Sequence, residues 1–136
     1  MTGDELIEQF EGGATVTDAF HHADHVRLAF EYLVRYSVLE ALRKFSAALL
    51  RFATAQGKAD RYHETITWAY LFLIRERMLR DAPPHTWEKF ADANADLLTC
   101  AKGSFGILDR YYRQETLASV AARAAFVLPD KAVSVS

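Results

Sequence analysis

A helical repeat of apolar residues runs through almost the whole chain of 136 residues, and it is the feature that most restricts the fold. Apolar side chains recur every three or four positions, which is typical of helices that pack one face into a core. The only prolines, Pro83, Pro84 and Pro129, lie between or after these segments. No stretch alternates as a strand does. The sequence therefore predicts an all-α protein.

Capping residues and glycines divide this pattern into separate helices. Gly12 ends a short first segment, Ser37 suits the N-cap of a later one, and Gly57 suits the left-handed position after that helix. Helices are expected over residues 4–10, from 17 or 18 to 36, 38–56, 62–81, 86–99 and, as one or two pieces, 105–126.

The length of the chain fits a single domain. Residues 1–16 are expected to form the short first helix and a loop, and residues 129–136 a C-terminal tail. Because the connections are short, consecutive long helices should be antiparallel neighbours, which predicts a bundle with four or five main helices. Residues 66–74 are apolar nearly all round, so the helix over 62–81 is expected to be the central, most buried one.

The helix expected to end near residue 36 carries an apolar stripe and a charged opposite face. Arg27, Glu31 and Arg35 follow one another on the charged face at intervals of four residues. Side chains spaced in this way are neighbours on a helix, so the sequence predicts ion pairs among them.

Composition excludes several classes of partner. The net charge of −2 gives no electrostatic reason to expect a nucleic acid or an anionic membrane surface. The longest apolar run, residues 68–74, is too short to cross a bilayer. The N-terminus lacks the basic start and apolar stretch of a signal peptide, and the single cysteine allows no disulfide within the chain. We therefore expect a cytoplasmic protein with a small-molecule substrate.

Two histidine clusters, distant in the sequence, are expected to meet. Three of the five histidines lie within residues 21–25, and His63 opens the helix over 62–81. His22 and His25 are three residues apart, so they share one helix face. If the chain reverses at Ser37, two helices of similar length bring both clusters to the same end of the bundle.

This arrangement predicts a metal site. Three imidazoles, from His22, His25 and His63, would bind a divalent transition metal, for which iron, manganese, zinc and copper are all suitable. Glu64 would be a fourth ligand or the acid–base residue beside an open position. The function that follows is a small metal-dependent enzyme acting on a small molecule, with the metal as a Lewis acid or an oxygen-activating centre.

Two alternatives stay open. The first is a non-enzymatic helical binding or interaction module with a structural His and Glu cluster, which could be a homodimer through exposed apolar residues of its outer helices. The second is a metal-free lyase or isomerase, in which His63 with Glu64, or His25 with Asp24, exchanges protons with the substrate. In the predicted metal site, Asp24 and Tyr62 are candidates for orienting the metal-binding histidines, and His21 is within reach of the metal.

Several motifs together resemble an uncharacterised bacterial family of small helical proteins. The resemblance extends from about residue 20 to residue 130, and its most specific part is the Tyr-His-Glu-Thr-Ile-Thr string at 62–67. It implies a His-x-x-His pair at His22 and His25, which favours these two over His21 as ligands. The other matching strings are residues 20–29, 108–112, 121–123 and 129–130.

Overall fold

The computed structural model describes residues 2–12 and 21–131, and every regular element within these ranges is a helix. The all-α prediction is confirmed. Five of the described helices have seven or more residues, as predicted for the main helices: α1 (Gly3–Gly12), α2 (His22–Arg35), α3 (Val38–Ala55), α4 (Glu64–Leu79) and α5 (Trp87–Ala93). The shorter elements are η1 (Ala59–Arg61), α6 (Ala95–Leu98), η2 (Gly106–Arg110), α7 (Gln114–Leu117) and α8 (Val120–Ala124).

The predicted caps of α3 are confirmed. The side chain of Ser37 accepts a hydrogen bond from the backbone N–H of Glu40 at 3.4 Å. Gly57, two residues past the end of α3, has a φ of 69°, which glycine adopts without steric cost. The predicted start of α2 at residue 17 or 18 lies outside the described residues.

The C-terminal third is more broken than predicted. The helix expected over 86–99 is interrupted at Asn94, whose side-chain amide donates to the Phe90 carbonyl at 3.0 Å and whose backbone leaves the helical region. Asn and Asp side chains compete for backbone groups in this way, which explains the interruption. Residues 105–126, expected as one or two helices, form η2, α7 and α8, with extended backbone at Arg113 and Ser119.

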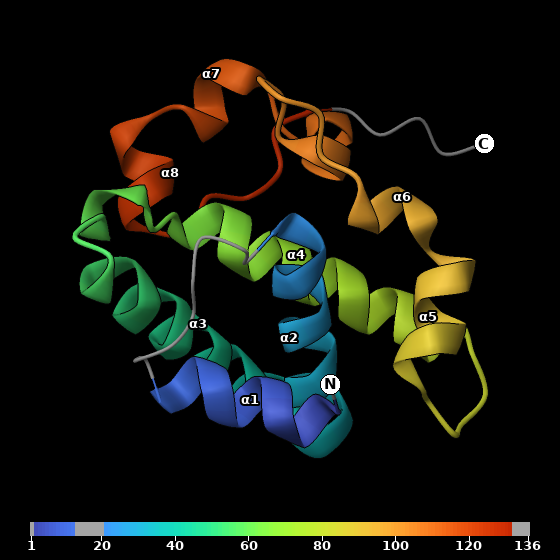
Figure 1. Cartoon of the computed structure of the whole chain (residues 1–136). Coiled ribbons are helices and arrows are strands. Elements are labelled where there is room, and N and C mark those ends of the chain that lie inside the picture. The colour runs from blue at the N-terminus through green and yellow to red at the C-terminus, as the bar shows by residue number, and fades with distance from the viewer. Residues whose placement is uncertain (1, 13–20, 132–136) are drawn as a thin grey trace.

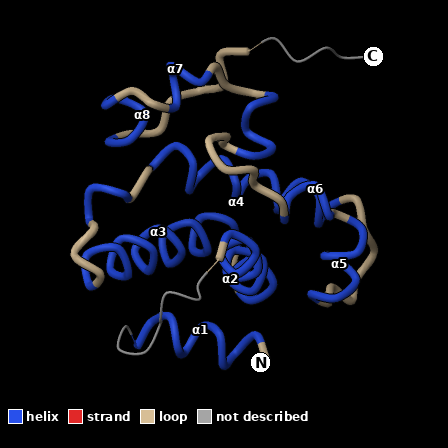
Figure 2. Tube along the Cα trace, turned by 45° about the horizontal axis from the view of Figure 1, so that its top comes forward, coloured by secondary structure: helices blue, strands red, loops and turns tan. Residues whose placement is uncertain are grey.

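The central helix is α2, so the prediction that α4 would be central and most buried is wrong. Figure 2 looks along α2, with α1, α3, α4 and α5 around it. All four of these helices contact α2, and so does α6. In the same view α3 lies across the picture, so α2 and α3 cross steeply (Figures 1 and 2). On α4, Phe72 and Leu79 are exposed.

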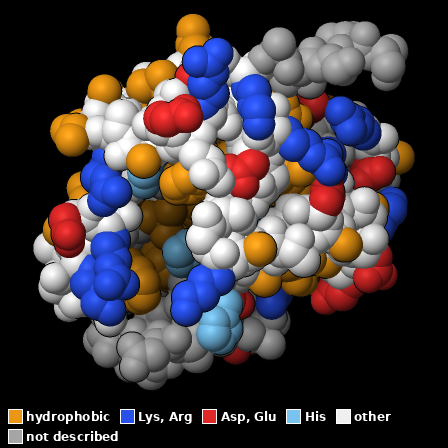
Figure 3. All heavy atoms as spheres, turned by 90° about the horizontal axis from the view of Figure 1, so that it is seen from above, with side chains coloured by type: hydrophobic (Ala, Val, Ile, Leu, Met, Phe, Trp, Pro, Cys, Tyr) orange, Lys and Arg blue, Asp and Glu red, His pale blue; other side chains and the backbone are white. Residues whose placement is uncertain are grey.

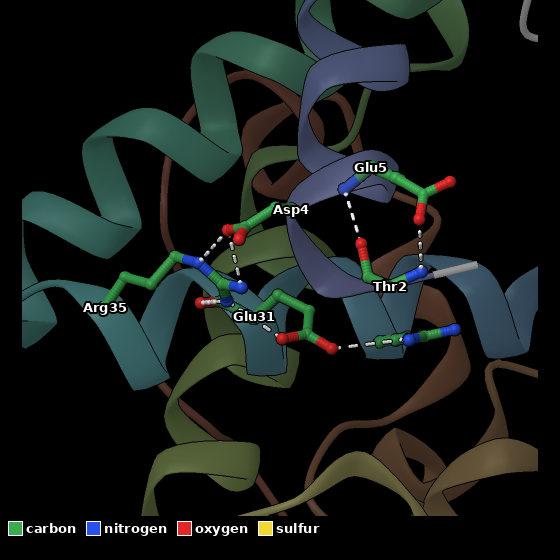
Figure 4. Close-up of polar contacts among 6 residues, drawn as sticks. Thr2, Asp4, Glu5, Glu31 and Arg35 are labelled. Atoms are coloured by element: carbon green, nitrogen blue, oxygen red, sulfur yellow. Dashed lines mark hydrogen bonds and ion pairs between the residues drawn. The ribbon is translucent and has the colours of Figure 1, made fainter.

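The charged face of α2 misled the prediction because α1 packs against Glu31, which lies on that face. Glu31 is only 7% exposed, and its carboxylate pairs with Arg27 at 3.3 Å and with Arg35 at 2.8 Å, as the spacing predicted. Arg35 also pairs with Asp4 of α1 at 2.8 Å (Figure 4). A charged group can be buried when it is paired and hydrogen-bonded. Glu31 can therefore lie under α1 although its charge predicts exposure to solvent.

At Gly3, α1 lies close against Glu31, and this contact gives a testable consequence. A Cβ added at Gly3 would lie 2.2 Å from the Glu31 Oε1 atom, which its two arginine partners hold in place. We expect Gly3→Ala to lower the free energy of unfolding by about 1 kcal/mol, the scale of losing one such contact. The matched control is Gly12→Ala, because a Cβ at Gly12 meets nothing within 4 Å. Equal stabilities of the two variants in urea unfolding would contradict this account of how α1 docks.

Within residues 2–12 and 21–131, no helix has the length and apolar character that crossing a bilayer requires.

Candidate functional site

His63 joins the start of α4 to α7. It is the N-cap of α4, where its Nδ1 atom accepts a hydrogen bond from the Ile66 backbone N–H at 3.1 Å. Its Nε2 atom lies 2.6 Å from the Leu117 carbonyl oxygen, so this nitrogen carries the proton and donates it. Burial lowers the pKa of His63 below its ordinary value, against the opposing effect of the bond to Leu117. The ring is therefore neutral, and both of its nitrogens are occupied by the protein.

Glu64 is held by two aromatic residues. Its Oε1 atom accepts hydrogen bonds from the hydroxyl of Tyr62 and, at 2.9 Å, from the indole N–H of Trp68. Burial, followed by the bond to Glu64, raises the pKa of Tyr62 to about 12. The Trp68 ring stacks on Phe126 with a centroid separation of 5.3 Å. The Glu64 bonds are therefore local to the start of α4, and the stacking of Trp68 on Phe126 connects α4 to the chain that follows α8.

Thr65 of the Tyr-His-Glu-Thr-Ile-Thr string also links α4 to the chain after α8, whereas Thr67 bonds within the start of α4. The Thr65 hydroxyl donates to the Ala125 carbonyl at 2.9 Å and accepts from the Val127 N–H at 3.0 Å. The Thr67 hydroxyl donates to the backbone carbonyl of His63 at 2.8 Å. Every polar side chain of this string is thus bonded to the protein, and the string fastens the C-terminal segments to α4.

The histidines of α2 differ in their surroundings. His22 Nε2 lies 3.0 Å from the Leu97 carbonyl oxygen, and its ring meets the edge of Tyr70 at a centroid distance of 5.0 Å. Burial lowers the pKa of His22, with the bond to Leu97 opposing. For His25, burial and the neighbouring charge of His22 lower the pKa to about 4, although Asp24 opposes this. His25 is therefore neutral at physiological pH.

His21 and Asp24 form the start of α2. The Asp24 carboxylate accepts a hydrogen bond from the His21 backbone N–H at 3.0 Å, an arrangement that caps the helix. The His21 side chain is exposed. We expected Asp24 to orient a metal ligand. Its carboxylate instead bonds to the backbone within its own helix turn.

The two histidine clusters do come together, at a cavity of about 530 Å³. His25 and His63 both line it, so one residue of each cluster borders the same hollow. Figure 3 shows this hollow with a hydrophobic interior, histidine side chains within it and Lys and Arg side chains at its edge. A smaller cavity of about 70 Å³, which His22, His25 and Tyr70 help to line, shares several walls with it. The other residues lining the larger cavity are Leu49, Phe52, Ala53, Gln56, Lys58, Arg61, Tyr62, Ile66 and Thr67.

The predicted metal ligands do not fit a metal ion as they are placed. Among the residues that the structure describes, no group of three or more His, Cys, Asp or Glu side chains could hold one. His63 offers no unbonded nitrogen, and His22 already uses Nε2 for the Leu97 carbonyl. Glu64 does not line the cavity. Metal binding by His22, His25 and His63 stays a prediction that no contact supports.

Sequence reasoning missed the other side of the cavity. Lys58 and Arg61 come from the connection between α3 and α4, and Leu49 and Phe52 come from the last turns of α3. The available signal was the position of Gly57. It ends α3 next to the start of α4, so the cations that follow it had to lie close to His63.

Comparison of the chain with protein-family models, with curated proteins and with solved structures finds no match in any of the three. The resemblance of residues 20–130 to an uncharacterised bacterial family stays a prediction.

Proposed function

We propose that this protein binds a small molecule without transforming it, in the cavity between the first turn of α2, the end of α3, η1 and the start of α4. The observation that carries the proposal is the cavity itself. Its volume of about 530 Å³ is within the range of small-molecule pockets, which are mostly apolar with a few polar groups. Leu49, Phe52 and Ile66 supply apolar wall, and His25 and Thr67 supply polar atoms.

The protonation states favour binding over acid–base catalysis. An efficient general base has a pKa near the working pH. His25, with its pKa lowered to about 4, is a weak base, and His63 has both nitrogens in hydrogen bonds. Glu64 points its bonded oxygen at Tyr62 and Trp68 and does not line the cavity. These features support a binding module over a metal-free lyase or isomerase.

The metal-dependent enzyme is the competing proposal, and it requires a rearrangement. His63 would have to give up the bond to the Leu117 carbonyl or the cap of α4 before it could ligate a metal. A buried carbonyl that loses its partner costs about 1–3 kcal/mol. No contact of the described residues favours this rearrangement. We therefore prefer the proposal that the cavity binds a small molecule.

Filling the cavity tests the proposal. Ala53 lines the cavity from α3, so Ala53→Trp should occupy part of it and weaken binding of a neutral apolar probe, n-decanol, by about tenfold or more, the equivalent of excluding two methylene groups. Isothermal titration calorimetry measures the affinity. Ala55→Trp, an exposed change in the same helix outside the cavity lining, should bind decanol as the wild type does. Equal binding by the two variants, or no binding by the wild type, would overturn the proposal.

A further inference from the structure

Two cations stand at the mouth of the cavity. Lys58 and Arg61 both line it, and both side chains are exposed. No acidic residue is among the described residues that line it. The backbone holds the pair on one short turn, because the Lys58 N–H donates to the Ala53 carbonyl at 2.8 Å and the Arg61 N–H donates to the Lys58 carbonyl at 2.9 Å. Neither cation forms an ion pair with an acid in the described parts of the chain.

We infer that the ligand is an amphipathic anion, with a carboxylate-type head at Lys58 and Arg61 and an apolar body inside the cavity. The inference rests on the proposed function and specifies the class of ligand. A guanidinium presents a planar fork of donors that matches a carboxylate, and an ammonium adds a second positive charge. The same cavity is lined by Leu49, Phe52 and Ile66, whose apolar side chains suit a hydrocarbon body.

The interior of the cavity fixes the orientation of such a ligand. An anion taken out of water needs a charged or donating partner, and it is costly to bury without one. The less exposed part of the lining includes the neutral ring of His25, which also lines the small cavity together with His22 and Tyr70. Neither histidine carries a positive charge at neutral pH, since burial lowers the pKa of both. The head group therefore stays at the mouth and the apolar end enters first.

The test compares two probes with the same chain, decanoate and n-decanol, on the wild type and on a Lys58→Gln, Arg61→Gln double variant. Both changes are at exposed positions, so folding is not at risk. Exposed ion pairs contribute about 1.5- to fivefold each in affinity, so the double variant should bind decanoate about two- to twenty-five-fold more weakly. Its affinity for decanol should not change. Lys102→Gln, an exposed change outside the cavity lining, is the matched control and should bind both probes as the wild type does.

The outcomes separate the two proposals. Decanoate binding that weakens in the double variant and with added salt supports the inference, because exposed charge interactions are screened. Equal affinity of the wild type for decanoate and decanol, or no effect of the double variant on decanoate, would overturn the anionic head while leaving the cavity as a binding site. Failure of both probes to bind the wild type would overturn the proposed function itself.

Discussion

We expect the His63→Ala variant to lose about 3 kcal/mol of unfolding free energy, because two interactions disappear together. The first is the N-cap of α4, where Nδ1 accepts from the Ile66 N–H. Removing a cap costs about 1 kcal/mol. The second is the Nε2–H bond to the carbonyl of Leu117, a residue that is 0% exposed, and leaving such a carbonyl unpaired costs about 1–3 kcal/mol. Urea unfolding followed by circular dichroism measures the loss.

His85→Ala is the matched control. His85 lies in the loop between α4 and α5, so we expect its variant to stay within about 0.5 kcal/mol of the wild type. The same pair of variants separates the structural role of His63 from the metal hypothesis. If His63 were a metal ligand, the purified wild type would contain close to one metal atom per chain, and His63→Ala would lose this metal. The metal-free wild type and the metal-free variant would then have equal free energies of unfolding. That result would contradict the structural role of His63 as the cap of α4 and the partner of the Leu117 carbonyl.

The helices could be predicted where one local signal decided them. Ser37 and Gly57 fix the ends of α3, because capping and left-handed backbone depend on the residue itself. The place of α2 at the centre could not be read from its sequence. Glu31 on its charged face is buried against Gly3 of α1, which is twenty-eight residues away in the sequence. The sequence pattern of α2 is the same whether Glu31 is buried or exposed to solvent. The difference depends on another helix, α1, which packs on this residue.

The sequence could predict that residues of the two histidine clusters lie near one another, but not the hydrogen bonds that their rings make. His25 and His63 do line one cavity, and its wall between them comes from the last turns of α3 and from the connection to α4. What the sequence could not show is the partner of each ring nitrogen. The carbonyl of Leu117 lies 54 residues from His63, in a segment whose broken helices were themselves not predicted. A histidine at a helix start can be a ligand or a cap, and only the distant partner distinguishes them.

The second large effect expected is a loss of stability in mild acid that depends on His25. Burial and the neighbouring His22 lower its pKa in the folded protein from an ordinary 6.5 to about 4. Between these values the unfolded chain binds the proton and the folded chain does not, so stability is complete above pH 6.5 and falls as the pH decreases. A shift of this size removes about 2 kcal/mol between pH 8 and pH 5 from His25 alone. His22 and His63 have lowered pKa values too, so they act in the same direction.

The pH slope of His25→Gln isolates this contribution. The variant cannot take up the proton at this position, so its unfolding free energy should fall by about 2 kcal/mol less than that of the wild type between pH 8 and pH 5. Ile66→Val is the control, because it alters the same cavity wall without a titrating group and should keep the slope of the wild type whatever its absolute stability. Urea unfolding at a series of pH values gives each slope. Parallel curves for His25→Gln and the wild type would mean that the folded protein accepts the proton as readily as the unfolded chain. His25 would then be exposed to water. The inferred orientation of the ligand would also fail, because it depends on a neutral, desolvated His25 in the cavity.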